Sequence, residues 1–275
     1  MDFSIIKRIL RFKITIQTIK DNMKATIIFA LLFSAMAAMY SSFYPQFKEL
    51  LADMANDPNF SNMLVGFTGG SGDFVSYIGF LNLELYSIFF VLILGIIIGF
   101  IAATIISKEI ESKTMDLLMS NPVSRKQIII ERFLGLVPMI LIIDFITMIS
   151  VYGVSVAIGE NMNFLNLFIA HLYAVPYFLA VIGIALLIST IFDEKMKSSI
   201  IMIAVLVGMF FIEYMSHFAQ DAKSIGLISL THYFKPYDAL KSGVVDANGV
   251  IVLLGVTIVT LIISIIYFDK KNIKV

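Results

Sequence analysis

Residues 85–106 read LYSIFFVLILGIIIGFIAATII, a run of 22 residues without a charged side chain. The hydrocarbon core of a bilayer is about 30 Å thick, and a helix needs about 20 mostly apolar residues to cross it. A helix also satisfies its own backbone hydrogen bonds, which lipid cannot do for an irregular chain. The run therefore predicts a membrane-spanning helix.

The composition of the whole chain agrees with a membrane protein. Of its 275 residues, 59% are hydrophobic and 15% are charged, whereas about a quarter of the residues in a soluble domain are charged. The 20 basic and 20 acidic residues give a net charge of zero, so no basic excess favours nucleic-acid binding. Cysteine is absent and the three histidines lack the spacing of a zinc motif, which excludes thiol chemistry and predicts no metal site.

Five further segments are long and apolar enough to cross a bilayer, so the chain is predicted to be an all-α integral membrane protein with a single domain over residues 1–275. An acidic residue lies inside two of these segments: Asp144 in the third and Glu213 in the fifth. The predicted spans are residues 25–42, 85–106, 133–158, 168–191, 198–216 and 249–268.

The distribution of basic residues predicts the orientation of the spans. Sixteen of the 20 lysine and arginine residues lie in 1–24, in the loops after the second and fourth spans, and in the C-terminal tail, while the other loops contain four. Basic residues near span ends stay on the cytoplasmic side. Both termini are therefore predicted to be cytoplasmic, in a multi-pass protein of the cell membrane.

Two segments outside the spans have an apolar character that a solvated loop does not need. In residues 1–24, apolar side chains recur at steps of three and four opposite basic ones, which predicts an amphipathic helix lying on anionic lipid headgroups. Between the fifth and sixth spans, residues 225–230 and 233–237 are rich in apolar and aromatic side chains. This composition favours a re-entrant outer segment, although loops packed against one another would explain it equally well.

The hairpin, residues 107–127, connects the second and third spans on the side predicted to be cytoplasmic. Read as one helix, it has a narrow apolar face at Ile110, Thr114, Leu117 and Leu118. A proline ends a helix before it, and a serine N-cap begins the next one; Pro122 and Ser124 stand at these positions. A rigid helix at the membrane surface is suited to transmit force from a separate protein.

The hairpin contains the pattern E-x-E-x-x-T-x-x-x-L-x-x-x-P-V-S-R, and it resembles the signature that follows the second span in ABC-2 type permeases, the membrane subunits of type V ABC exporters. The resemblance extends over the whole chain, from the basic N-terminal segment to the short basic tail. In two places the sequence departs from the family pattern: Lys113 replaces a usual glycine, and Arg132 replaces a usual lysine.

The resemblance implies that the hairpin is a coupling helix, which docks on a separate ATPase subunit that binds ATP and Mg. It also implies that two copies, or this chain and a related permease, form the transport path, in contact with membrane lipids. The residues expected to couple to the ATPase are Glu109, Glu111, Thr114, Met115, Leu118, Pro122, Val123 and Arg125.

No sequence of the form G-x-x-x-x-G-K-[ST] occurs in the chain, so it has no P-loop and we expect no catalytic or cofactor-binding residue in it. An ion-coupled secondary transporter is the alternative, because Asp144 and Glu213 are costly inside a membrane and could carry ions along the path. Each could equally be a structural residue. We expect His171 to lie at the membrane interface, and Glu213 to reach the interface or its neighbour Tyr214.

Overall fold

The computed structural model describes residues 12–58, 60, 64, 73–120, 122–217 and 223–272. Within these residues the fold is entirely helical, and six helices are long and apolar enough to cross a membrane. Each of the six predicted spans coincides with one of them. The elements are α2 (Lys13–Ala55), α4 (Tyr77–Leu81), the π-helix η1 (Asn82–Leu94), α5 (Gly95–Thr104), α6 (Ser107–Glu111), α7 (Met115–Met119), α8 (Arg125–Ala157), α9 (Phe164–Ile191), α10 (Lys195–Ser216), α11 (Lys223–Gly226), the 3-10 helix η3 (Leu230–Tyr233), α12 (Pro236–Ser242) and α13 (Ala247–Lys270).

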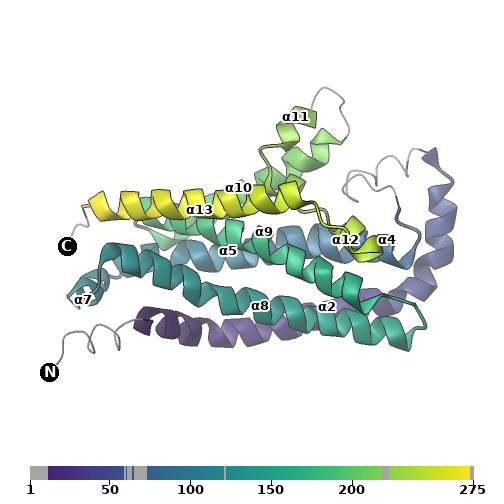
Figure 1. The fold of residues 1–275 in the computed structure, drawn as a ribbon, viewed down its shortest axis with the longest axis horizontal. Coiled ribbons are helices and arrows are strands. Elements are labelled where there is room, and N and C mark those ends of the chain that lie inside the picture. Colours follow the sequence, from purple (N-terminus) through teal and green to yellow (C-terminus); the bar gives the residue numbers. More distant parts are fainter. Residues whose placement is uncertain are drawn as a thin grey trace.

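The long helices form an elongated bundle (Figure 1). The start of α2, the end of α13 and the short α7 lie at one end of the bundle, as Figure 1 shows. The connection between α8 and α9 and the short helix α12 lie at the other end. Because the chain crosses the bundle an even number of times, the start of α2 and the end of α13 lie at the same end. The assignment of this end to the cytoplasm stays a prediction.

The first helix differs from its prediction. Residues 13–24 do not form a separate interfacial helix, because they continue without a break into the first span as the 43-residue helix α2. The predicted boundary at residue 24 is therefore wrong, and residues 1–11 of the predicted interfacial helix lie outside the described residues. α2 contains Pro45, which removes one backbone donor, and the helix bends so that its last turns cross the far end of the bundle (Figure 1).

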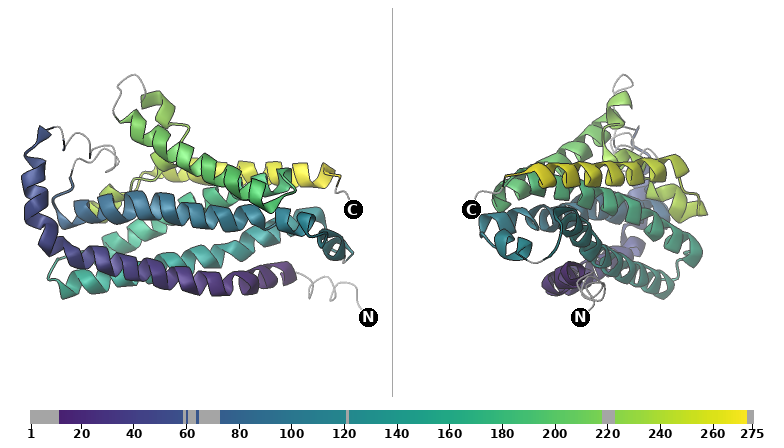
Figure 2. Two further views of the ribbon diagram at one scale, coloured as in Figure 1. Left: turned by 180° about the vertical axis from the view of Figure 1, so that it is seen from behind. Right: turned by 60° about the vertical axis from the view of Figure 1, so that its left-hand side comes forward.

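The centre of the bundle is α9. In their most apolar 18-residue stretches, 67% of α9 is buried but only 28% of α10, and α10 diverges from the bundle toward its outer end (Figure 2). The second span contains a π-helix of 13 residues, Asn82–Leu94, a rare conformation that the composition does not predict. The hydroxyl of Tyr177 in α9 donates to the carbonyl of Val91 in this π-helix (2.9 Å).

Glycines allow three pairs of helices to approach closely. A Cβ atom on Gly99 of α5 would lie 3.1 Å from Met202 of α10, and one on Gly183 of α9 would lie 2.4 Å from the hydroxyl of Thr260 in α13. Small residues permit such approaches between membrane helices. The third close pair, α2 and α8, meets at Gly135 and Thr18, where the distance would be 2.5 Å.

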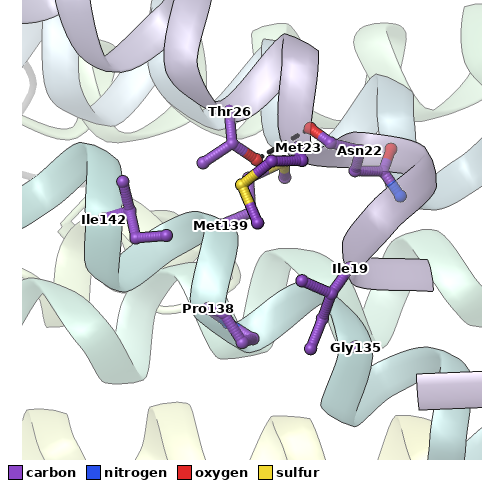
Figure 3. A pocket seen from close by; sticks show the side chains of 8 residues that line it. All are labelled: Ile19, Asn22, Met23, Thr26, Gly135, Pro138, Met139 and Ile142. Atoms are coloured by element: carbon purple, nitrogen blue, oxygen red, sulfur yellow. Dashed lines mark hydrogen bonds between the residues drawn. The ribbon is translucent and has the colours of Figure 1, made fainter. Parts of the chain in front are cut away.

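The contact between α2 and α8 leaves only a small hollow beside Gly135. Figure 3 shows it between the two helices, with Pro138 and Met139 of α8 facing Ile19 and Asn22 of α2. Every residue that lines it is uncharged, and Thr26 donates its hydroxyl proton to the carbonyl of Asn22 (2.9 Å). The hollow is thus a packing feature at a proline rather than a polar binding site.

The outer segment, residues 223–246 between α10 and α13, packs against the bundle. The Phe234 ring stacks on Tyr177 with ring centroids 5.6 Å apart, and the hydroxyl of Tyr173 donates to the carbonyl of Tyr233 (2.6 Å). These contacts with α9 account for the apolar and aromatic composition of the outer segment. Its re-entrant position in the bilayer stays a prediction.

A polar contact joins the outer segment to the loop before α4. The Tyr237 hydroxyl donates to Oδ2 of Asp73 (2.6 Å), and Ser76 donates from both its hydroxyl and its backbone amide to the same carboxylate (2.7 and 3.1 Å). Burial raises the pKa of Asp73, but these hydrogen bonds and the nearby Lys241 outweigh it and lower the pKa below its ordinary value. The ionised carboxylate therefore joins the loop before α4 to the outer segment.

Substitution Gly135→Ala tests the close contact of α2 and α8. The added methyl group would collide with Thr18, and overpacking of this kind costs about 1–3 kcal/mol. We expect a lower melting temperature of the purified protein, followed by circular dichroism because the chain contains neither tryptophan nor cysteine for the usual optical probes. Gly153→Ala in the same helix is the control, since no described atom lies within 4 Å of its added Cβ. Equal melting temperatures for the two variants would contradict the prediction.

Candidate coupling site at the hairpin

The hairpin is built from two short helices and not from one. α6 and α7 have five residues each, and a turn at Ser112–Thr114 separates them. The prediction of one continuous amphipathic helix is therefore wrong. The N-cap prediction is confirmed, because the Ser124 hydroxyl accepts a hydrogen bond from the Gln127 amide (3.1 Å) at the start of α8.

The break between α6 and α7 occurs at Lys113, whose φ angle is 55°. This left-handed conformation brings the Cβ atom of an L-residue close to the following carbonyl and costs about 1–2 kcal/mol, whereas glycine adopts it freely. Lys113 is the position where the resemblance led us to expect glycine. The backbone conformation gives the physical reason for that expectation.

A buried ion pair connects the hairpin to α8 and α2. The Arg132 guanidinium of α8 forms a salt bridge with Glu109 of α6 and also donates to the Thr18 hydroxyl of α2 (2.8 Å). The side chain of Arg132 is 7% exposed and that of Glu109 is 20% exposed. Glu109, predicted to couple to a partner, thus contacts the body of the protein itself.

A second acidic residue, Glu131, caps the first described turn of α2. Its Oε2 atom accepts hydrogen bonds from the backbone amides of Ile14 (3.0 Å) and Thr15 (3.2 Å). Amides in the first turn of a helix have no partner within the helix, and a negative charge there complements the helix dipole. Sequence reasoning missed Glu131, because the capped residues lie 117 positions away and no local pattern connects them.

Two of the predicted coupling residues also contact helix ends. The Glu111 carboxylate accepts a hydrogen bond from the Lys195 amide at the start of α10 (2.8 Å). The Arg125 guanidinium donates to the carbonyls of Phe268 (2.8 Å) and Lys271 (2.6 Å) at the end of α13. Each charge has the sign that stabilises the helix end it contacts.

The same end of the bundle contains two more such contacts. The Lys271 ammonium, just after α13, donates to the carbonyls of Thr190 (2.6 Å) and Ile191 (3.1 Å) at the end of α9. The Ser189 hydroxyl of α9 accepts hydrogen bonds from the amides of Ile106 and Ser107, both at 3.0 Å. Through these contacts and those above, the hairpin region connects to the ends of α2, α9, α10 and α13.

The remaining predicted coupling residues occupy different depths. Leu117 of α7, which belongs to the predicted apolar face, is 70% exposed and is the most exposed large apolar side chain of the described hairpin. Thr114 and Pro122 are exposed, Leu118 and Val123 are half-buried, and Met115 is 1% exposed. On the turn and α7, Lys113, Thr114 and Leu117 are exposed, and these three residues form the outward side of the hairpin.

Comparison with known protein families identifies the family of this chain. A model of the ABC-2 family transporter proteins matches residues 13–273, nearly the whole chain. The protein belongs to the ABC-2 transporter family. It is therefore a multi-pass membrane protein and an ABC transporter permease. No curated protein matches the sequence.

The acidic residue inside the third span of this ABC-2 permease has a partner. Asp144 accepts a hydrogen bond through Oδ1 from Nδ1 of His171 in α9 (2.7 Å), and Nε2 of His171 lies 2.9 Å from the Tyr86 hydroxyl of η1. The side chains of Asp144 and His171 are fully buried inside the protein, and the expected position of His171 at the membrane interface stays a prediction. The three residues form a polar chain that joins α8, α9 and η1.

The acidic residue of the fifth span has partners in the outer segment. Glu213 lies 3.1 Å from Nε2 of His217 and 3.0 Å from Nδ1 of His232, and it is 6% exposed. Glu213 is thereby joined to the outer segment, and the expectation that it reaches the interface or Tyr214 stays a prediction. Family membership does not favour the ion-coupled alternative for Asp144 and Glu213, and both carboxylates contact histidines within the described residues.

The described residues contain no group of three side chains that could ligate a metal ion. The chemistry of this end of the permease is thus hydrogen bonding and charge at helix ends.

Replacing Lys113 by glycine tests the strain at the turn. Lys113→Gly removes the left-handed conformation's cost, whereas Lys113→Ala removes the same side chain and keeps that cost. We expect the glycine variant to be more stable than the alanine variant by about 1 kcal/mol, seen as a higher midpoint of thermal unfolding by circular dichroism. Identical midpoints would show that the turn is not strained at this residue.

A double-mutant cycle tests the buried ion pair. Arg132→Met leaves the Glu109 carboxylate without its cation, and breaking a buried pair from one side costs about 3–5 kcal/mol. We expect the double variant Glu109→Gln/Arg132→Met to be more stable than Arg132→Met alone, in the same unfolding measurement. If the second substitution destabilises the protein further, the pair is not the dominant contact of Arg132.

Proposed function

We propose that this chain is the membrane-spanning permease subunit of an ATP-driven exporter, and that a separate ATPase subunit, which binds ATP and Mg, docks on the outward side of the hairpin. The chain itself performs no chemistry. One observation carries the proposal: the hairpin contacts the ends of several membrane helices from inside and presents Leu117 on its outer side.

The physical basis of this proposal is that the two sides of the hairpin have different surroundings. Glu109 and Arg125 have their partners within the permease, so they position the hairpin. Leu117 is a large apolar side chain, 70% exposed, on a helix at the end of the bundle. An apolar side chain of this kind, surrounded by polar neighbours, suits the centre of a protein–protein contact.

A transport path between two membrane subunits completes the proposal. Either a second copy of this chain or a related permease pairs with it in the cell membrane, and nucleotide-driven movement of the hairpin opens and closes the path. The extended α10, with little of its length buried in the bundle, is available for contacts outside this single chain.

The test is copurification of the ATPase with the tagged permease from its native membranes in mild detergent. We expect a stoichiometric P-loop ATPase with the unaltered permease and at least a tenfold loss with Leu117→Asp, because a charge replaces the apolar centre of the contact. Substitutions at the inward Glu109 would test folding rather than docking. Asn272→Asp is the control, since it adds the same charge at the same end of the bundle, on an exposed residue outside the hairpin.

Gel filtration and circular dichroism of each variant show whether it is folded. Retention of the ATPase by a folded Leu117→Asp variant would place docking elsewhere. Isolation of the unaltered permease without any ATPase would exclude the proposed subunit role.

A further inference from the structure

The fifth membrane helix, α10, is loosely packed along its length, as are α2 and α13. Only 28% of its most apolar stretch is buried, the same share as in α2 and less than half of the share in α9. Its principal lateral contact is with α5, at Gly99 and Met202. A helix with so little lateral packing takes its position largely from the contacts at its two ends.

The first end of α10 is capped by the hairpin. The backbone amide of Lys195, in the first turn, donates to Oε2 of Glu111 in α6 (2.8 Å). The N-cap residue itself, Glu194, makes no side-chain capping bond among the described residues. The first turn of α10 therefore depends on a carboxylate that lies 84 positions earlier in the sequence.

The second end of α10 is joined to the outer segment by another carboxylate. Glu213 contacts His217, which is the residue that follows the helix, and His232 of η3. The Ser229 hydroxyl donates to the carbonyl of Met209 (2.8 Å), which adds a second connection between α10 and the outer segment. With 22 residues, α10 spans about 33 Å between its two anchored ends.

We propose that Glu111 is a positioning residue that transmits movement of the hairpin through α10 to the outer segment. The inference rests on the proposed function, because it requires the hairpin to move when the ATPase subunit binds nucleotide. An α-helix resists axial compression, so a displacement at Lys195 is carried to Glu213 and from there to η3. Glu111 is thereby assigned to transmission, and docking is left to the outward surface around Leu117.

The absence of native cysteine allows a direct test in the isolated permease. Ile228 of the outer segment is 67% exposed, so Ile228→Cys provides a single thiol whose rate of reaction with a membrane-impermeant maleimide reports the position of the segment. In lipid nanodiscs we expect Glu111→Ala to change this rate by about fivefold, the size expected from the loss of one helix cap.

Two variants serve as controls in this first measurement. Glu111→Gln keeps an oxygen that can accept the Lys195 amide proton and should restore the original rate. Glu194→Ala removes an exposed carboxylate at the same helix end that forms no capping bond there among the described residues, and it should have no effect. An unchanged rate in Glu111→Ala would overturn the inference.

The second measurement uses the complex with the ATPase. In the unaltered background, trapping the complex with ATP and vanadate should change the labelling rate of Ile228→Cys. In Glu111→Ala the ATPase should still copurify, but the nucleotide should no longer change the rate. This loss of response with docking intact is not expected of a residue that only stabilises the fold.

Three results separate the inference from the proposed function. A nucleotide response that survives in Glu111→Ala overturns the inference and leaves the subunit role standing. Loss of the ATPase from Glu111→Ala also overturns it, because Glu111 would then be a docking residue. Absence of the ATPase from the unaltered permease refutes the proposed function, and the labelling rates of the isolated permease still decide whether Glu111 controls the outer segment.

Discussion

Membrane helices leave their first amides and last carbonyls without partners, and in this permease charged side chains at one end of the bundle supply them. Glu131 caps α2, Glu111 caps α10, and Arg125 and Lys271 contact the last carbonyls of α13 and α9. The sign of each charge matches the dipole of the helix end it contacts. These contacts hold the helix ends together at this end of the bundle, and two of them, those of Glu111 and Arg125, come from the hairpin.

This constraint also explains how one short segment can act on a large bundle. A hairpin that floated beside the membrane could bind a partner without moving the spans. Here it is joined to α8 and α2 through Arg132 and Glu109, and to α10 and α13 through Glu111 and Arg125. Its inward side is committed to the permease and its outward side, around Leu117, is available to a partner.

Inside the bilayer, polar groups follow a related rule. A lone carboxylate in a low-dielectric interior is costly, and it persists when hydrogen bonds satisfy it. Asp144 meets His171, and His171 meets Tyr86, so three elements share one polar chain. Glu213 performs the same task near the outer end of α10 with His217 and His232. These contacts stabilise the bundle without requiring ion transport.

The sequence alone determined the membrane class, the six spans and the family, because hydropathy and the E-x-E-x-x-T pattern are properties of continuous segments. The family's usual glycine at the position of Lys113 agrees with the turn that the structure contains, with φ at 55°, but the sequence was interpreted as one continuous helix there. The break of the hairpin into α6 and α7 escaped prediction, because apolar periodicity continues across the turn.

Only the tertiary structure decided which charges face inward and which residues face out. In the sequence, nothing distinguishes Glu109, Glu111 and Arg125 from exposed docking residues. In the structure, each contacts a group that lies 23 to 146 positions away. The contacts of His171 with Asp144 of α8 and Tyr86 of η1 were likewise visible only in the packed structure. Periodicity shows which side of a helix is apolar, but the partner of a helix end or of a buried carboxylate is set by the packing of distant segments.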